Sequence, residues 1–196
     1  MSYIRKIAAA AILAASYGSV YAVPVTVNSA FTGAEPTLGD RLTRNGTPSN
    51  CVGMKPYPGL QGAGAYSYRT DAIANAGVSQ CMTVTINEGT CAVNSTFISV
   101  YAGAFNPADL SQNYLGDAGV SGNVSFQVTV PAATNLVFVT NRVASGANPA
   151  CAYSFTYDLP IPAVAESVPT LSEWGMITLS ALMALGAVVV TRRSRS

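Results

Sequence analysis

The sequence predicts an all-β protein, folded as an antiparallel two-sheet β-sandwich. The chain of 196 residues is only 10% charged, and its length fits one domain with short appendages. Its many Val, Thr, Gly and Asn residues favour strands and turns. About seven or eight β-rich runs alternate with turn signals, which is the pattern of a sandwich. An apolar segment at each end adds a signal helix before this body and a single transmembrane helix after it.

The N-terminal stretch MSYIRKIAAAAILAASYGSVYAVP has the three parts of a secretory signal, namely a basic start, an apolar core over residues 7–15 and small residues before a cleavage site. An ordinary N-terminal helix is the alternative. The apolar core is too short to span a bilayer, and Pro24 prevents a helix from continuing. We therefore expect residues 1–22 to be a signal peptide. It would direct the chain through the Sec translocon, and signal peptidase would cleave the chain between Ala22 and Val23.

The body, residues 23–159, contains the candidate strands. Residues 125–130 alternate polar and apolar side chains, as a half-buried strand does. The runs FISVYAGAF and NLVFVTNRV are denser and are expected near the middle of the sandwich. Residues 87–90 and 131–134 have turn chemistry. The expected strands are 25–31, 65–70, 81–86, 96–101, 123–130, 136–143 and 151–159.

The region from residue 37 to residue 64 differs from the rest of the body. It is rich in Pro and Gly and has few apolar anchors. We expect long loops here, with one short strand near Asp40–Asn45. Cys51 is expected to restrain the region through a disulfide bond.

Four cysteines, an even number, reach an oxidising compartment if the chain is exported. Of the three possible pairings we favour Cys81–Cys91, which closes a short local loop, and Cys51–Cys151, which ties the early chain to the last strand. A zinc site is the alternative. The chain has no histidine and no C-x-x-C pair, so the sequence favours disulfides over zinc.

Runs distributed over the body, GDRLTRNGTPSNC, YSYRTDAIAN, CMTVTI, VYAGAFNP, YLGDAG and VSFQVTVPAATNLVFVTN, resemble a β-sandwich module of bacterial exported and surface proteins. The resemblance is to pre-peptidase C-terminal and jelly-roll-like domains. It implies a jelly-roll-like sandwich. Because packing and turns explain each apolar, Gly and Pro position, the resemblance implies no function.

The body contains few side chains that could act in catalysis or bind a metal. Without histidine a Ser-His or Cys-His pair is impossible, and we expect no enzyme. Asp109 and Asp117, in the polar loop NPADLSQNYLGDAG, remain as candidates for paired carboxylate chemistry. Together with Asn106 and Asn113 they also offer oxygen ligands for Ca2+, but not at EF-hand spacing. A solvated loop with Asx-turns is the favoured interpretation, so no cofactor is expected.

The charged and aromatic residues limit the classes of partner that the body can bind. Residues 23–167 carry five basic and eight acidic side chains without a basic patch, which argues against nucleic acid. Tyrosines can form a sugar-stacking face, although they are also ordinary sandwich residues. The sequons at Asn45, Asn94 and Asn123 match glycosylation acceptors and are interpreted as chance. The body tyrosines are Tyr57, Tyr66, Tyr68, Tyr101, Tyr114, Tyr153 and Tyr157.

The C-terminal segment from Gly175 to Thr191 has no formal charge. As a helix it spans about 25 Å, at ~1.5 Å per residue, enough to cross a bilayer core of ~30 Å with Trp174 at one interface. Thr178 and Ser180 can bond back to their own helix carbonyls. A buried helix of a water-exposed domain is the alternative, but it would show a polar face.

The ends of this segment set its orientation. Arginines in the tip, residues 192–196, hold the C-terminus in the cytoplasm by the positive-inside bias, while the body is exported. A spacer over residues 160–167 precedes the segment and gives it reach. The stop-transfer residues are Arg192, Arg193 and Arg195.

The block VPTLSEWG lies directly before the apolar segment. With that segment and the Arg-rich end, residues 168–196 resemble the IPTL-CTERM protein-sorting signal of Gram-negative bacteria, whose motif is I-P-T-L-S-E-W-G. Only Val168 departs from it, in place of Ile. The resemblance implies processing by an exosortase, with this chain as substrate. The motif residues are Val168, Pro169, Thr170, Leu171, Ser172, Glu173, Trp174 and Gly175.

We therefore expect an exported, non-enzymatic surface or extracellular-matrix protein. Its precursor would be anchored in the inner membrane with the body outside the cytoplasm, and would then reach the cell surface or the medium. The resemblance implies that the protein works alongside extracellular polysaccharide, which is then a candidate partner. The alternatives are a secreted module that binds carbohydrate or Ca2+, and a permanently membrane-anchored protein that faces the periplasm.

Overall fold

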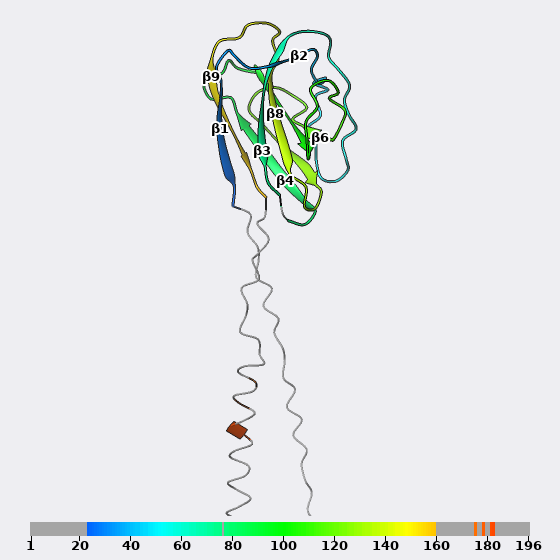
Figure 1. The fold of residues 1–196 in the computed structure, drawn as a ribbon, viewed down its shortest axis with the longest axis vertical. Helices are drawn as coiled ribbons and strands as arrows, with labels where there is room; N and C mark the ends of the chain where they lie inside the picture. Colours follow the sequence, from blue (N-terminus) through cyan, green and yellow to red (C-terminus); the bar gives the residue numbers. More distant parts are fainter. Residues whose placement is uncertain (1–22, 76, 160–174, 176–177, 179–180, 183–196) are drawn as a thin grey trace, which may run out of the picture. The chain divides into compact units, whose positions relative to one another are not determined.

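The computed structural model describes residues 23–75 and 77–159, together with Gly175, Thr178, Ala181 and Leu182. The chain divides into two compact units, Met1–Pro162 and Ala163–Ser196. The described part of the first unit is all-β and contains no helix (Figure 1). The expected signal peptide, the spacer and motif residues 160–174 and the Arg-rich tip lie outside the described residues.

All seven expected strands of the body are present, each within a few residues of its expected bounds. The longest shift extends the second expected strand to Ile73. Two further strands complete the set. In chain order the strands are β1 Val25–Phe31, β2 Thr37–Leu38, β3 Tyr66–Ile73, β4 Gln80–Asn87, β5 Thr96–Ala102, β6 Tyr114–Asp117, β7 Val124–Val130, β8 Leu136–Arg142 and β9 Cys151–Tyr157.

Two expectations about strands were wrong. Residues 40–45 form only an isolated bridge, between Leu42 and Leu60, and the short strand of this region is β2 instead. Strand β6 lies within the stretch that the sequence predicts to be a loop. Its sequence YLGD contains Gly and Asp, which are depleted in strands, and only its pairing with β5 across a bulge makes it a strand.

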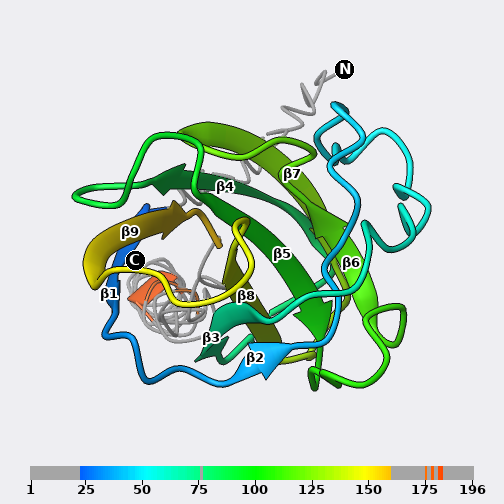
Figure 2. The ribbon, with the colours of Figure 1, turned by 90° about the horizontal axis from the view of Figure 1, so that it is seen from above.

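The strands form two antiparallel sheets. One has the order β1-β9-β4-β7 and the other β2-β3-β8-β5-β6. Seen along the strands, the sheets face each other and enclose the core (Figure 2). Apart from the consecutive pairs β2–β3 and β5–β6, neighbouring strands are not consecutive in the chain, so most of the pairing is long-range, as between Val25 and Tyr157.

The two sheets are buried differently. In β7, Phe126, Val128 and Val130 face the core while the residues between them are exposed, which confirms the predicted half-buried strand. Strands β5 and β8 are buried along almost their whole length. They occupy the middle of the five-stranded sheet, as their dense apolar sequence predicts, because protein covers both faces of this sheet.

The segment of residues 39–64, here called the covering segment, lies outside the sheets and passes β6 (Figure 2). Its own backbone bonds fold it back on itself: Thr43 N–H donates to the Gly59 carbonyl (2.9 Å) and Gln61 N–H to the Arg41 carbonyl (2.8 Å). The Arg41 guanidinium lies 5.3 Å from the ring centre of Tyr66 in β3. The segment therefore packs as a layer rather than as a free loop.

The favoured disulfide pairing was wrong. The bonds are Cys51–Cys81 and Cys91–Cys151, which close 30 and 60 residues respectively. Cys81 and Cys91 lie at opposite ends of the extended strand β4 and its following turn, so their side chains cannot meet although they are close in sequence. The expectation that Cys51 restrains its region is met through a different partner.

Four residues of the C-terminal unit are described, and they are helical and exposed. The Thr178 hydroxyl donates to the Gly175 carbonyl at 3.1 Å, which confirms the predicted bond to the helix's own backbone. Within the described residues we find no helix with the length and apolar character needed to cross a membrane.

Candidate functional site

Asp117, the buried acid of the polar stretch, is bound by protein groups on both oxygens. Its Oδ1 accepts from Lys55 Nζ (2.5 Å) and from Gly119 N–H (2.6 Å), and its Oδ2 accepts from the Tyr114 hydroxyl. The side chain has no solvent exposure, and that of Lys55 has only 6%. An ion pair buried in this way holds the covering segment against β6.

The backbone around Asp117 fits the covering segment closely. The Asp117 N–H donates to Ser49 Oγ (2.8 Å), and Ser49 N–H donates to the Asp117 carbonyl (3.0 Å). Gly119 has φ +69°, and a Cβ there would lie 2.3 Å from the Thr47 carbonyl carbon. Only glycine fits that approach without a backbone shift.

Asp109, the other candidate acid, lies on an exposed loop. Its Oδ1 accepts from the Ser111 hydroxyl (2.6 Å) and N–H (3.1 Å). The Ser111 hydroxyl hydrogen bond is the main cause that lowers the pKa of Asp109. The described residues contain no cluster of three or more metal-ligating side chains. With Asp117 already saturated by protein donors, the geometry gives the Ca2+ candidate no support.

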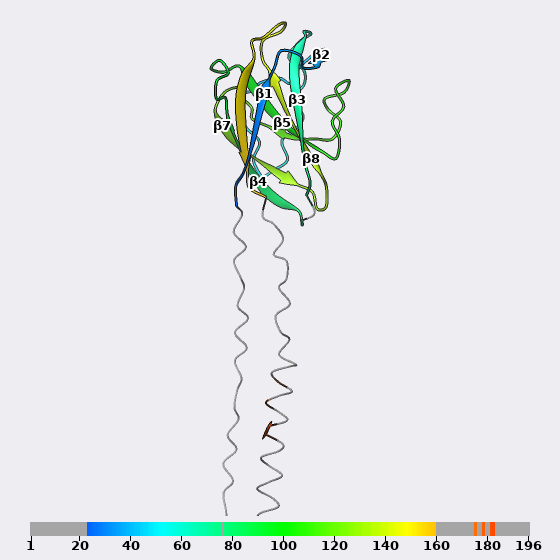
Figure 3. The ribbon, with the colours of Figure 1, turned by 60° about the vertical axis from the view of Figure 1, so that its left-hand side comes forward.

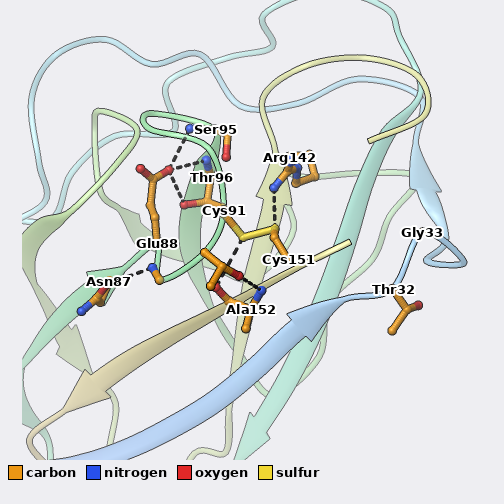
Figure 4. The surroundings of a disulfide bond; sticks show 12 residues. Thr32, Gly33, Asn87, Glu88, Cys91, Ser95, Thr96, Arg142, Cys151 and Ala152 are labelled. Atoms are coloured by element: carbon orange, nitrogen blue, oxygen red, sulfur yellow. Dashed lines mark hydrogen bonds between the residues drawn. A yellow bond between two sulfur atoms is a disulfide. The ribbon is translucent and has the colours of Figure 1, made fainter. Parts of the chain in front are cut away.

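Glu88 is a buried acid that sequence reasoning placed in an ordinary turn. Its Oε1 accepts from Ser95 N–H (2.7 Å), Thr96 N–H (2.8 Å) and the Thr96 hydroxyl (2.9 Å), and its Oε2 accepts from Asn94 N–H (2.7 Å). Figure 4 shows the carboxylate directed at this backbone. It fixes the loop that carries Cys91.

The same region holds the second disulfide. Arg142, buried at the end of β8, directs its Nη1 at the sulfur of Cys151 (2.8 Å; Figure 4). Its guanidinium also lies 5.4 Å from the ring centre of Phe31. Burial lowers the pKa of Arg142. The cluster ties β9, β8 and the loop after β4 together and is structural.

The structure does not gather the seven body tyrosines on one face. Tyr153 and Tyr157 are buried between the sheets. Tyr114 packs edge-on against both Tyr57 and Tyr101 under the covering segment. Burial raises the pKa of Tyr101, Tyr114 and Tyr153. The sugar-stacking face that the sequence left open is therefore reduced to the few rings that reach a cleft.

One cleft of about 570 Å3 lies on the five-stranded sheet. Its walls come from the β1–β2 loop, from β3 and from the β5–β6 loop, and they include Glu35, Tyr68, Arg69, Phe105 and Pro107. Burial acts to raise the pKa of Glu35, but the hydrogen bonds from Thr32 and Gly33 outweigh it and hold the pKa below its usual value.

The comparisons with known proteins concern the two parts of the chain separately. The IPTL-CTERM motif family matches residues 166–195, the region in which the sequence predicts the sorting signal. No curated protein sequence matches the chain.

Three solved structures resemble the chain at low identity. They are PliG, a periplasmic inhibitor of g-type lysozyme from Aeromonas hydrophila (16% identity, 70% of this chain and 86% of that chain, TM-score 0.42); a family 35 carbohydrate binding module from Clostridium thermocellum (12%, 69% and 98%, 0.30); and the K3 adhesin domain of Lys-gingipain from Porphyromonas gingivalis W83 (16%, 54% and 67%, 0.27). These values are too low to carry a functional argument.

The described body is an all-β sandwich of two antiparallel sheets with two disulfides. The part of the chain that follows it is matched by a sorting motif. The chain thus joins a β-sandwich body to a C-terminal IPTL-CTERM motif at residues 166–195.

Proposed function

We propose that this chain is an exported, non-enzymatic surface or matrix protein that an exosortase processes at its C-terminus. The observation that carries the proposal is the IPTL-CTERM motif over residues 166–195. The two disulfides of the body support export, because disulfides persist in oxidising compartments. The proposed route begins with signal peptidase cleavage between Ala22 and Val23.

The proposed organisation has four parts. Residues 1–22 are the signal peptide, 23–159 the sandwich, 160–167 the linker and 168–196 the sorting signal. The strand order supports a jelly-roll-like arrangement, because without the two-residue β2 each sheet has four strands. In the precursor, residues 175–191 cross the inner membrane.

Each end of the proposed membrane segment has a physical role. Pro169 keeps the motif extended, as a protease cleft requires. Ser172 caps the helix, and Glu173 is favourable at its positive end. Trp174 fixes the depth at the outer interface, while the arginines of the tip stay in the cytoplasm.

The test uses the native host and compares the parent chain with three variants. Pro169→Ala should accumulate as a membrane-bound precursor with a protease-accessible body. Val168→Ile, which changes the one departing residue to that of the motif, should be processed like the parent. A chain that ends at Ser167 should be absent from the membrane fraction. If the parent and this truncated chain fractionate identically, and neither is membrane-bound, the proposal fails.

Mass spectrometry of the mature protein separates the proposal from permanent anchoring. The proposed product begins at Val23 and lacks Arg192, Arg193 and Arg195. A mature chain that keeps all three arginines supports the permanently anchored, periplasm-facing alternative. The same measurement in a host without its exosortase should yield only a chain that begins at Val23 and keeps its C-terminal arginines.

A second function for the body is a module that binds an extracellular polysaccharide. The observation that favours it is the cleft of about 570 Å3, whose walls combine aromatic and charged side chains. Ligand sites are commonly clefts of this size with a few placed polar groups. In this reading, sorting delivers the module to the surface where the polysaccharide is found.

A further inference from the structure

Strand β3 has a free edge beyond its short pairing with β2. β2 pairs only with Ser67 and Tyr66. Among the described residues, the strand from Arg69 to Ile73 is therefore paired on one side alone, with β8. Strand β1 belongs to the other sheet and runs next to β3 at this side of the sandwich (Figure 3).

Two depressions meet at this edge. The first is the cleft of about 570 Å3, and the second, of about 460 Å3, lies between β1 and β3 and includes Ser29 and Asp71. Thr32 and Arg69 line both. The two depressions therefore adjoin at the edge of the strand, at Arg69, and are together called the β3 groove here.

One side of the β3 groove is aromatic. The rings of Tyr68 and Phe105 pack edge to face with centres 5.5 Å apart, and Pro107 continues the same wall. Both aromatic side chains are only partly buried. Aromatic and proline rings offer flat apolar surfaces to the C–H faces of a sugar ring, while the hydroxyls at the sugar's rim stay available for hydrogen bonds.

The other side of the β3 groove is polar and unsatisfied. The side chain of Arg69 is 39% exposed, and its Nη1 lies 3.9 Å from Glu35 Oε1, too far for a close hydrogen bond. Within the described part of the chain, the side chain of Asp71 has no hydrogen bond to its buried Oδ2. Leaving a buried polar atom without a partner costs about 1–3 kcal/mol. Asp71 as a whole is only partly buried, so a ligand hydroxyl can approach its carboxyl group from the edge of the strand.

The charges around the β3 groove select against an acidic ligand. Glu35 and Asp71 flank the single guanidinium of Arg69. Two carboxyl groups against one cation give an acidic rim, and like charges repel a polyanion. The body as a whole is also mildly acidic, with seven acids against five bases over residues 23–159.

We propose that the β3 groove binds an uncharged polysaccharide, with Tyr68 and Phe105 contacting sugar rings and with Arg69 and Asp71 hydrogen-bonding to adjacent hydroxyls. The inference rests on the proposed second function of the body and assigns it a site and a ligand class. A peptide added to the free edge of β3 is a different partner. It would use the backbone of the strand and would not need the Tyr68 ring or the Asp71 carboxyl.

The test is affinity electrophoresis of the exported full-length chain, in a detergent with a polyoxyethylene headgroup so that no sugar is introduced. The probes are dextran, hydroxyethyl cellulose and galactomannan as neutral polysaccharides, and alginate as an acidic one. We expect at least one neutral polysaccharide to retard the parent chain and alginate to have no effect. Tyr68→Ala should weaken binding about tenfold through lost ring contact.

Asp71→Asn keeps the size of the side chain and should also weaken binding about tenfold, because a hydrogen bond to a charged group is lost. Gln127→Ala, an exposed change on β7 in the other sheet, is the matched control and should bind like the parent. The circular dichroism of each variant verifies its fold, and Asp71→Asn keeps the test valid if Tyr68→Ala misfolds.

Three results would overturn the inference: no retardation by any neutral probe, equal retardation of the parent and Asp71→Asn, or retardation by alginate alone. The outcome is separate from that of the proposed sorting function. A chain that is correctly processed in its host and yet fails to bind overturns the groove assignment and leaves sorting intact.

Discussion

Lys55 Nζ lies 2.5 Å from Asp117 Oδ1, and the carboxylate has no exposure to solvent. The two residues are 62 positions apart, one in the covering segment and the other at the end of β6. Lys55 thus occupies one of the carboxylates that the sequence offered as alternative oxygen ligands for Ca2+. The ion pair gives the covering segment a specific attachment besides its apolar contacts.

Asp117→Asn should destabilise the body by about 3–5 kcal/mol, since it leaves a buried lysine charge without its partner. Urea unfolding followed by tyrosine fluorescence measures the loss. Asp109→Asn is the control, and its midpoint should equal that of the parent because this carboxylate is exposed. Equal midpoints for the two variants would show that the ion pair does not hold the segment.

The double variant Lys55→Met with Asp117→Asn should recover part of this loss, because replacing both charges removes the uncompensated one. The recovery distinguishes loss of the pair from general damage to β6. If the double variant is less stable than Asp117→Asn alone, the lysine charge is not what destabilises the single variant.

Sequence reasoning located the strands because their signal is local. The alternation in β7 and the dense runs of β5 and β8 follow from burial on one or both faces. What could not be found in this way depends on long-range contacts. Strand β6 exists because β5 and the covering segment flank the weak sequence YLGD, and no local pattern shows this.

The distinction between local signals and long-range contacts also explains why the disulfide pairing and the role of Glu88 were not predicted. Cysteine spacing suggested a local bond from Cys81 to Cys91, whereas strand geometry keeps these residues apart and pairs each across the fold. Glu88 had the sequence of a turn residue, and its role depends on backbone groups six to eight residues later. The sequence carries no signal for this anchor, because the positive φ of Asn94, next to the amides that bind Glu88, is visible only in the structure.

The two disulfides should differ in their response to limiting reductant. Cys91 and Cys151 are buried, at 8% and 9% exposure, whereas Cys81 is exposed on the outer side of β4. Thiolate attack requires access to the sulfur. We therefore expect the Cys51–Cys81 bond to be reduced first. Alkylation after partial reduction, followed by peptide mass mapping, measures the order, and prior labelling of Cys91 would contradict the burial argument.

Removing the Cys91–Cys151 bond should cost more than removing the other. It closes 60 residues rather than 30, and doubling a loop adds about 0.6 kcal/mol of closure entropy. The change to alanine also affects a buried site. Thermal unfolding of the two paired Cys→Ala variants compares them. A lower midpoint for the variant without Cys51–Cys81 would show that attachment of the covering segment dominates.

Glu88→Gln should loosen the loop before β5. The change removes the charge and one acceptor, and a hydrogen bond to a charged group contributes about 1.5–3 kcal/mol. Amide exchange should quicken at Asn94, Ser95 and Thr96, whose N–H groups donate to the carboxylate. Native-state hydrogen exchange measures this site by site.

Glu35→Gln is the matched control for Glu88→Gln. Glu35 also accepts several local bonds, from Thr32 and Gly33, in the loop between β1 and β2, and its side chain is only 2% exposed. Because these bonds hold a different loop, Glu35→Gln should leave exchange at residues 94–96 unchanged. If both variants accelerate exchange at these amides, a general loss of stability rather than the Glu88 contact is responsible.

Alkaline titration should reveal the buried tyrosines. Burial raises the pKa of Tyr101, Tyr114 and Tyr153 above its ordinary value, which is about 10 in an unfolded chain. The folded state therefore keeps these phenols protonated. Its stability from this source is complete below the unfolded pKa and is lost as pH rises from there towards the folded pKa.

Tyrosinate absorbance should accordingly rise in two stages. The first, near pH ~10, reports the accessible tyrosines, and the second coincides with loss of circular dichroism as the buried ones are released. In denaturant all the tyrosines should titrate together. A single reversible stage in the folded protein, completed before any loss of circular dichroism, would mean that solvent reaches the rings beneath the covering segment and that this layer is not closed.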